Sequence, residues 1–352
     1  MTEYITYKPY LAHLLNKITL TWILKANLDV SLKLLVLFIL STLCKIFTAC
    51  HYSTYLLRNQ ILVSSAFFTL YFLLNFMKIL LNIVHIYSQI MYKDLWKKLQ
   101  FKREFGDKRI SASTCALCMH LFIYLLLILV YIHYLTNIKD TIYTKVMAAV
   151  FLFTSVANIM VLYQFTYVMD IIIQLMKKIN KEMESTEQFK SAVSGNLKLL
   201  TEQHNHLMDS AQIVNKIFSW QILTICLRSF MELTCHNYGL LVNLTKDYDK
   251  NIQDRIWHIF RILLNITEIS TIVHFCEYFS KEAKKFNTYL FQYLRNKQME
   301  FTKAEFDLHY YSLMKREIIF TAAGFFDLGY PLITTMIGTT VTFLVIVVQF
   351  TF

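Results

Sequence analysis

The C-terminal segment 332–352 contains no charged residue, and this limits what the chain can fold into more than any other feature. About 20 apolar residues in a helix cross the roughly 30 Å hydrocarbon core of a bilayer. The segment therefore has the length of one transmembrane helix. The apolar sequence extends further back, to Phe320, but Pro331 lies within it. Proline lacks a backbone N–H and restricts the residue before it, so we expect residues 327–331 to interrupt the helix.

Six further apolar segments of similar length precede the last one. They cover residues 30–47, 61–87, 116–135, 146–169, 217–241 and 256–276. Hydrophobic residues make up 56% of the 352 residues, against about 45–50% in an ordinary soluble domain. The sequence therefore predicts an all-α, polytopic membrane protein with seven transmembrane helices.

Two of the linking segments are long enough to form helices of their own. In segment 170–215 apolar residues recur at helical spacing: Ile171, Leu175, Ile179, Met183, Leu197, Leu200, Leu207 and Ala211. We expect two cytoplasmic helices that extend the fourth and fifth membrane helices and are joined near residues 185–195. A polar, basic helix is expected over 280–316. His204 and His206 are expected on a solvated face.

Lysine and arginine are distributed unevenly between the two sides of the membrane. One set of segments, which includes the N-terminal arm, holds 24 of them, and the other set holds only the six at positions 58, 139, 145, 246, 250 and 255. Cytoplasmic loops carry the excess of positive charge in membrane proteins. We therefore expect the N-terminus inside and the C-terminus outside, and we attribute the net charge of +11 to loops beside the membrane rather than to a nucleic-acid surface.

Charged residues within the predicted membrane helices mark a candidate site, since an unpaired charge in hydrocarbon is costly. Arg228 and Glu232 lie one turn apart in the fifth span, and Arg261 and Glu268 lie two turns apart in the sixth. They are expected either to form structural ion pairs or to line a ligand pocket in the outer half of the bundle. The second interpretation adds polar and aromatic side chains of the kind found in small-ligand pockets: Tyr131, Tyr134, Asn158, Asn237, Trp257 and Asn265.

In the terminal helix, Thr342, Val345 and Gln349 follow i, i+3, i+7 spacing and so share one stripe. This stripe either packs against other helices of the same chain or lines a pore between subunits. The sequence Thr342-Phe343, five apolar residues and Gln349-Phe350 resembles the TYhhhhhQF signature at the C-terminus of insect gustatory receptors. Phe343 stands where the family usually has tyrosine. Residues 206–218 also resemble the family's lead-in to its fifth span.

The resemblance implies a ligand-gated, non-selective cation channel in the plasma membrane of a sensory neuron, with one pore formed by the last helix of four subunits. Gln349 and Phe350 would lie at its outer constriction, with Val345 and Thr342 along the same stripe. The implied partners are a small-molecule tastant, membrane lipid, and identical or other gustatory receptor subunits. The resemblance also implies three functional parts of the chain. Residues 1–276 would hold six membrane helices and the ligand pocket, with the cytoplasmic segment 170–215 among them. Residues 277–327 would form cytoplasmic assembly helices, and residues 328–352 the pore helix.

Other classes of function fit the sequence less well. It contains no Gly-rich phosphate loop, His-Glu-x-x-His or serine elbow, so we expect no catalytic residues, metal, cofactor or nucleic-acid partner. A secondary transporter is the main alternative, although two repeated halves with paired broken helices are not visible. A G-protein-coupled receptor is less compatible because its orientation is opposite.

The charge distribution makes a topology prediction. Antibody against a tag placed after Phe352 should label cells that have not been permeabilised, because the C-terminus is expected outside. Labelling that requires permeabilisation would reverse the orientation and favour the G-protein-coupled class.

Overall fold

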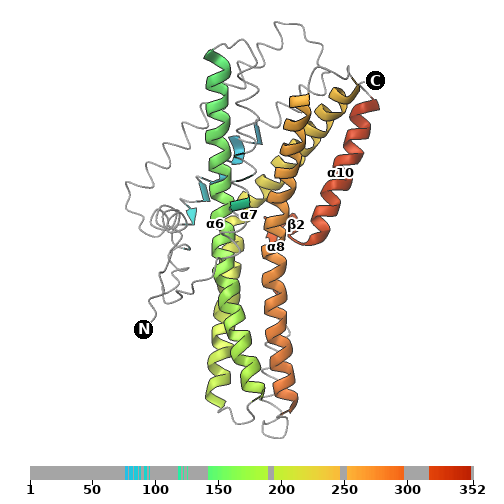
Figure 1. Cartoon of the computed structure of the whole chain (residues 1–352). Coiled ribbons are helices and arrows are strands. Elements are labelled where there is room, and N and C mark those ends of the chain that lie inside the picture. The colour runs from blue at the N-terminus through green and yellow to red at the C-terminus, as the bar shows by residue number, and fades with distance from the viewer. Residues whose placement is uncertain are drawn as a thin grey trace, which may run out of the picture. The chain divides into compact units, whose positions relative to one another are not determined.

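The computed structural model describes residues 142–188, 194–245, 252–296 and 317–349, together with scattered positions between 76 and 125. Its described elements are three long helices, a short hairpin and a terminal helix (Figure 1). They are α6 (Ile142–Gln188), α7 (Ser194–Thr245), α8 (Ile252–Asn296), β1 (Thr321–Ala322), β2 (Phe326–Asp327) and α10 (Tyr330–Gln349). The first predicted span lies outside the described residues, and the second and third are described only at scattered positions.

The three long helices are each more than twice as long as a membrane crossing requires. They contain 47, 52 and 45 residues, which at 1.5 Å per residue gives about 70–80 Å each, against roughly 30 Å of hydrocarbon. The end of α6 at Gln188 and the start of α7 at Ser194 confirm the predicted junction near residues 185–195. The basic helix expected from residue 280 is continuous with α8 as far as Asn296, and residues 297–316 lie outside the described part.

Length and composition alone identify one membrane-compatible helix among the described residues, Arg255–Tyr293 of α8. The segment Tyr330–Ile346 of α10 is a shorter apolar helix.

The chain divides into two compact units, and each long helix contributes a segment to both. The first unit comprises Met1–Gln164, Trp220–Glu268 and Met336–Phe352, and the second comprises Phe165–Ser219 and Ile269–Thr335. The functional divisions expected at residues 276/277 and 327/328 are defined by role rather than by packing, and they stay predictions.

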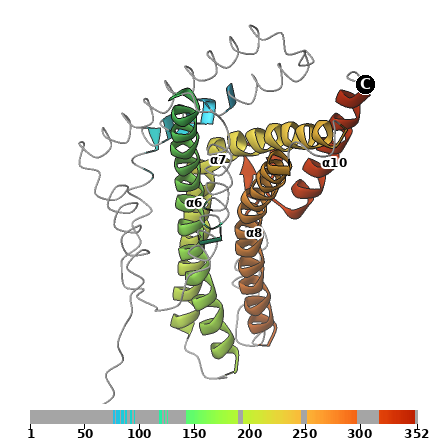
Figure 2. The same cartoon turned by 45° about the horizontal axis from the view of Figure 1, so that its top comes forward.

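The second unit is built around a three-helix core in which α6, α7 and α8 lie side by side (Figures 1 and 2). Its buried apolar side chains recur at helical spacing on all three helices: Met169, Ile172, Met176, Ile179 and Met183 on α6, Leu200, Leu207, Ala211 and Val214 on α7, and Phe279, Ala283, Phe286 and Leu290 on α8. Ring contacts join the helices in pairs, Phe165 with Phe218 and His204 with Phe286.

Two sequence-based predictions in this unit need correction. Ile171 and Leu175 are only half-buried, because the buried stripe of α6 passes through Ile172 and Met176 instead. His204 is not on a solvated face: it is 1% exposed and stacks on Phe286 with ring centroids 4.1 Å apart, whereas His206 is exposed as expected. The predicted burial of Ile179, Met183, Leu200, Leu207 and Ala211 is confirmed, and the Leu197 side chain lies outside the described part.

The interruption expected at residues 327–331 is present, and a small hairpin precedes it. Strand β1 pairs antiparallel with β2, and the turn between them places Ala323 at φ 52° and Gly324 at φ 79°. Left-handed backbone at both central positions defines a tight hairpin turn, for which glycine has no steric cost. Helix α10 then begins at Tyr330, with Pro331 in its first turn, where the missing N–H costs no hydrogen bond.

The corrected stripe of α6 can be tested with two neighbouring substitutions. Met176→Ala should lower the free energy of unfolding by about 2–5 kcal/mol, because it leaves a cavity at a fully buried position. Leu175→Ala is the matched control and should cost less, since Leu175 is half-buried. Thermal denaturation of the purified variants measures both. Equal losses would contradict the position of the stripe.

Candidate functional site

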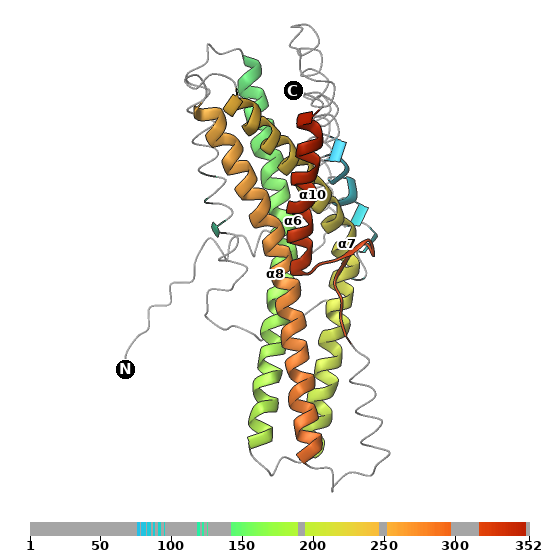
Figure 3. The same cartoon turned by 90° about the vertical axis from the view of Figure 1, so that its right-hand side faces the viewer.

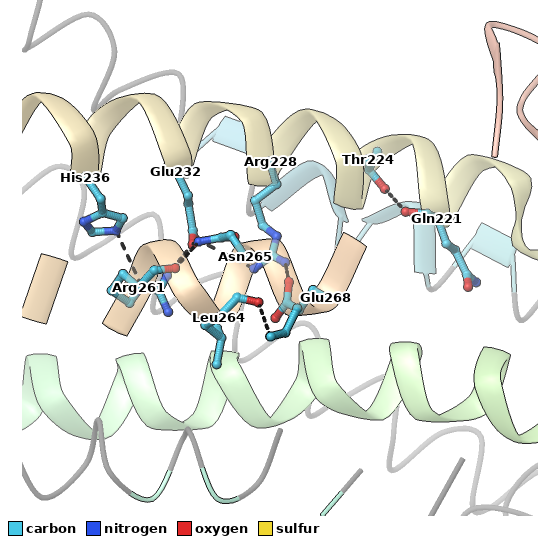
Figure 4. A network of polar contacts seen from close by, with 10 residues as sticks. Gln221, Thr224, Arg228, Glu232, His236, Arg261, Leu264, Asn265 and Glu268 are labelled. Carbon is cyan, nitrogen blue, oxygen red and sulfur yellow. Dashed lines mark hydrogen bonds and ion pairs between the residues drawn. The ribbon is translucent and has the colours of Figure 1, made fainter. Parts of the chain in front are cut away.

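Four charged residues on facing segments of α7 and α8 form crossed ion pairs inside the first unit (Figure 4). Arg228 Nη2 of α7 pairs with Glu268 Oε2 of α8, and Arg261 Nη2 of α8 pairs with Glu232 Oε2 of α7 at 2.6 Å. All four residues are at most 3% exposed. Each helix therefore supplies one arginine and one glutamate, and each charge finds its closest opposite charge on the other helix.

Glu232 is the acceptor at the centre of this network. Its Oε2 also accepts a hydrogen bond from Asn265 Nδ2 at 2.9 Å, and its Oε1 lies 3.8 Å from Arg228 Nη1. Asn265 donates in addition to the backbone carbonyl of Arg261 at 2.8 Å, which fixes the amide on α8. Glu232 thus contacts both arginines, one on its own helix and one on the neighbouring helix.

Two histidines continue the network along the same pair of helices. Arg261 Nε lies 3.5 Å from His236 Nε2, and His236 Nδ1 lies 3.0 Å from His258 Nδ1. The His258 ring packs closely on the backbone of α7: a Cβ on Gly239 would lie 2.5 Å from His258 Cε1. Only glycine at position 239 leaves room for this ring without displacing it.

The network is electrically balanced, and it joins α7 to α8. Two arginines and two glutamates cancel, so hydrocarbon surrounds no net charge, and the cost of burying the ions is offset by their mutual attraction and hydrogen bonds. Removing one partner would leave an uncompensated charge. A ligand that reaches these four groups must therefore exchange one of the existing contacts.

The structure brings together most of the predicted pocket residues that it describes. Arg228, Glu232, Arg261 and Asn265 contact one another as listed above. Trp257 is half-buried on α8, and Asn237 donates to the carbonyl of Leu233 on its own helix at 2.8 Å. Asn158 lies in α6, but its side chain, like Tyr131 and Tyr134, is outside the described part. Ligand binding at any of these residues stays a prediction.

His236 and His258 were not among the predicted site residues. The one available signal was the spacing of His236 from Glu232, four residues along α7, and of His258 from Arg261, three residues along α8. Such spacing places side chains on the same face of a helix. It does not identify which residues of another helix they meet.

Helix α10 is exposed over most of its described surface. Met336 and Thr340 are its buried positions among the described residues, and Phe343, itself 38% exposed, makes an edge-to-face contact with Phe230 of α7 at 6.5 Å. Two residues further along, a second stripe contains Gly338, Thr342, Val345 and Gln349, all exposed. Two residues correspond to about 200° around a helix of 3.6 residues per turn, so the stripes lie on opposite sides. Phe350 lies outside the described part.

The start of α10 is held within the second unit. Figure 3 shows the segment that leads to α10 running beside α7, where the Thr321 N–H donates to Asn215 Oδ1 at 3.2 Å. Phe320 packs edge-to-face on Phe279 of α8. The Tyr330 hydroxyl lies 3.5 Å from His274 Nδ1, and the ammonium of Lys281 lies over the Tyr330 ring at 5.5 Å.

A second polar group in the same unit joins α6 to α8. Asn180 Nδ2 donates to both the carbonyl and the Oε2 of Glu282, at 2.9 and 3.0 Å. Lys285 Nζ donates to Glu282 Oε1 at 2.8 Å, and this hydrogen bond raises the pKa of Lys285 above its ordinary value. The contacts satisfy a carboxylate that is 4% exposed, which gives this group a structural role in the three-helix core.

These features define an all-α, polytopic membrane protein, and the chain belongs to the 7tm chemosensory receptor family, whose sequence pattern matches residues 24–352. It is 26% identical over 155 residues to a protein of Drosophila melanogaster named "Putative gustatory receptor 28b". That match covers 43% of this chain and 33% of the relative, so the chain is matched to about a third of that protein's length.

Two solved structures have the same fold. They are structures of the insect olfactory receptor OR5 from Machilis hrabei, one in complex with eugenol. The complex matches with a TM-score of 0.67 at 12% identity, and the other with 0.66 at 13%. Both matches cover 97% of this chain and 99% of the receptor. Identity this low supports a shared fold and nothing finer.

The charge network predicts a specific defect. Glu232→Gln should reduce the amount of folded receptor at the cell surface, because it leaves two buried arginines with one counter-charge, a loss of about 3–5 kcal/mol for a broken buried pair. Surface labelling and thermal denaturation of the purified protein measure the effect. Glu182→Gln is the control, since its contact with Lys178 is exposed and 4.0 Å long and should contribute at most about 0.5 kcal/mol. Normal expression with a shifted dose–response curve would instead favour the ligand-pocket interpretation.

Proposed function

We propose that this chain is a subunit of a tastant-gated, non-selective cation channel in which four copies arrange their α10 helices around a central pore. One observation carries the proposal: α10 is buried at only two of its described positions, Met336 and Thr340, and the stripe opposite them, which ends in Gln349, is exposed. In a single copy that stripe faces nothing in the described part of the chain. In a tetramer it faces the common axis.

The composition of the exposed stripe supports a pore better than a lipid-facing surface. Gln349 is exposed near the end of a membrane-length helix, and an amide is costly in hydrocarbon unless it meets water or another subunit. Thr342 is compatible with either surface, because its hydroxyl donates to the Gly338 carbonyl at 3.0 Å. Val345 supplies an apolar ring, of the kind that closes a pore by excluding water.

The proposed ligand is a small molecule that binds among the outer parts of the membrane helices. The family comprises chemosensory receptors, and the olfactory receptor with the same fold was solved in complex with eugenol. Binding favours the open state only as far as the ligand prefers that state over the closed one. In this proposal the crossed ion pairs set the positions of α7 and α8, and Asn158, Asn237, Trp257, Tyr131 and Tyr134 supply ligand contacts. The channel would act in the plasma membrane of a sensory neuron, alone or with other gustatory receptors.

The pore assignment is tested by cysteine scanning of α10. Thr342→Cys, Val345→Cys and Gln349→Cys should be blocked by water-soluble thiol reagents during opening, because their stripe lines the pore. Met336→Cys and Thr340→Cys are matched controls at the two buried positions described for α10 and should resist block. The measurement is ligand-evoked current before and after the reagent. Block that does not depend on the helical face would remove α10 from the pore.

Alanine substitutions at the proposed constriction test the pore assignment independently. Gln349→Ala and Phe350→Ala should alter basal current or ion selectivity more than ligand affinity, since the proposal puts both residues at the narrow outer end. A shifted affinity with unchanged selectivity would contradict this placement.

A further inference from the structure

The two histidines at the end of the charge network form a contact that depends on their protonation. His236 of α7 and His258 of α8 are both half-buried, and their Nδ1 atoms lie 3.0 Å apart. A hydrogen bond between two imidazole nitrogens requires one proton donor and one unprotonated acceptor. The hydrogen bond therefore exists only while one of the two facing nitrogens carries a proton and the other does not.

The neighbouring arginine determines where the protons are. Arg261 has only donors, so its Nε, 3.5 Å away, makes a long hydrogen bond in which His236 Nε2 is the acceptor. The proton of a neutral His236 is then on Nδ1, and it is donated to Nδ1 of His258. A further proton on His258 Nδ1 would set two N–H groups against each other. A further proton on His236 Nε2 would face the guanidinium of Arg261.

The charges around the pair come from both helices. Arg261 lies next to His236, and Arg255 and Asp254 lie three and four residues before His258 on α8. Glu232 belongs to the same network, and its carboxylate already contacts Arg261 and Asn265. The His258 ring is also confined by Gly239, where a Cβ would come within 2.5 Å of it. A protonated ring must therefore move away from α7.

We propose that His236 and His258 form a proton-binding site on the predicted outer side of the membrane, where acid weakens the contact between α7 and α8. Imidazole changes charge between about pH 5 and pH 8, which is a range that external fluids reach. A metal ion fits the pair less well, since no group of three histidine, cysteine, aspartate or glutamate residues is placed to bind one in the part of the chain that the structure describes. The effect on channel activation, as distinct from the effect on helix contact, rests on the proposed function.

The experiment compares the wild type with His236→Gln and His258→Gln at about pH 7.5 and about pH 5.5, across the range in which imidazole takes up a proton. Thermal denaturation of the purified receptor measures the helix contact, and basal current without added tastant, recorded at both external pH values, measures activation. The wild type should lose thermal stability at the lower pH and change its basal current by about fivefold or more, a typical allosteric coupling. Both effects should shrink in the two variants, because glutamine cannot be protonated.

The controls separate this site from general effects of acid. His206→Gln changes an exposed histidine on the same helix, α7, and should keep the full pH dependence. If neither pair variant reaches the surface, Gly239→Ala displaces the His258 ring without removing a titratable group and should reduce the pH dependence. A wild type without pH-dependent stability, or pair variants that keep it, would overturn the proposal. A wild type that passes no current, but whose pH-dependent stability is lost in the pair variants, would refute a channel formed by this chain alone and leave the proton site standing.

Discussion

The crossed ion pairs between α7 and α8 fix how these two helices meet in the described part of the first unit. Arg228 with Glu268 and Arg261 with Glu232 bury four charges that are each at most 3% exposed. On each helix, the arginine and the glutamate make their closest ion pairs with residues of the other helix. A slip of one helix by a single turn, about 5.4 Å, would separate both pairs at once. The ion pairs therefore help to fix the register of these two helices.

Helix α10 contacts the rest of the first unit at few described positions. Its described packing contacts run along a single stripe and include Phe343 on Phe230 of α7. Thr342 and Thr335 satisfy their hydroxyls on their own helix, at the carbonyls of Gly338 and Pro331. Such a helix demands few specific partners. It can be covered by lipid, by other helices of the chain or by copies of itself, and the exposed amide of Gln349 favours a covering that includes water.

The sequence predicts the helices well because their signals are local. Segment length, apolar spacing and Pro331 predicted α6, α7, the start of α8 and the interruption before α10. Partner choice could not be predicted in the same way. Spacing alone suggested Arg228 with Glu232, whereas the closest partner of each lies on α8. His204 was misplaced because a polar residue can fill a buried position when it stacks on an aromatic ring such as Phe286. The hairpin was missed because two-residue strands carry no alternation to detect, and Phe350, Tyr131 and Tyr134 lie outside the described part.

Helix α8 also carries the contacts that hold the start of α10 within the second unit. His274 approaches the Tyr330 hydroxyl, and Glu277 lies one turn further along the same helix. The Glu277 carboxylate packs so closely on Gly329 that a Cβ there would lie 2.8 Å from Oε1. A side chain at position 329 would have to displace this carboxylate, so the close approach of α8 requires glycine at the point where the chain enters α10.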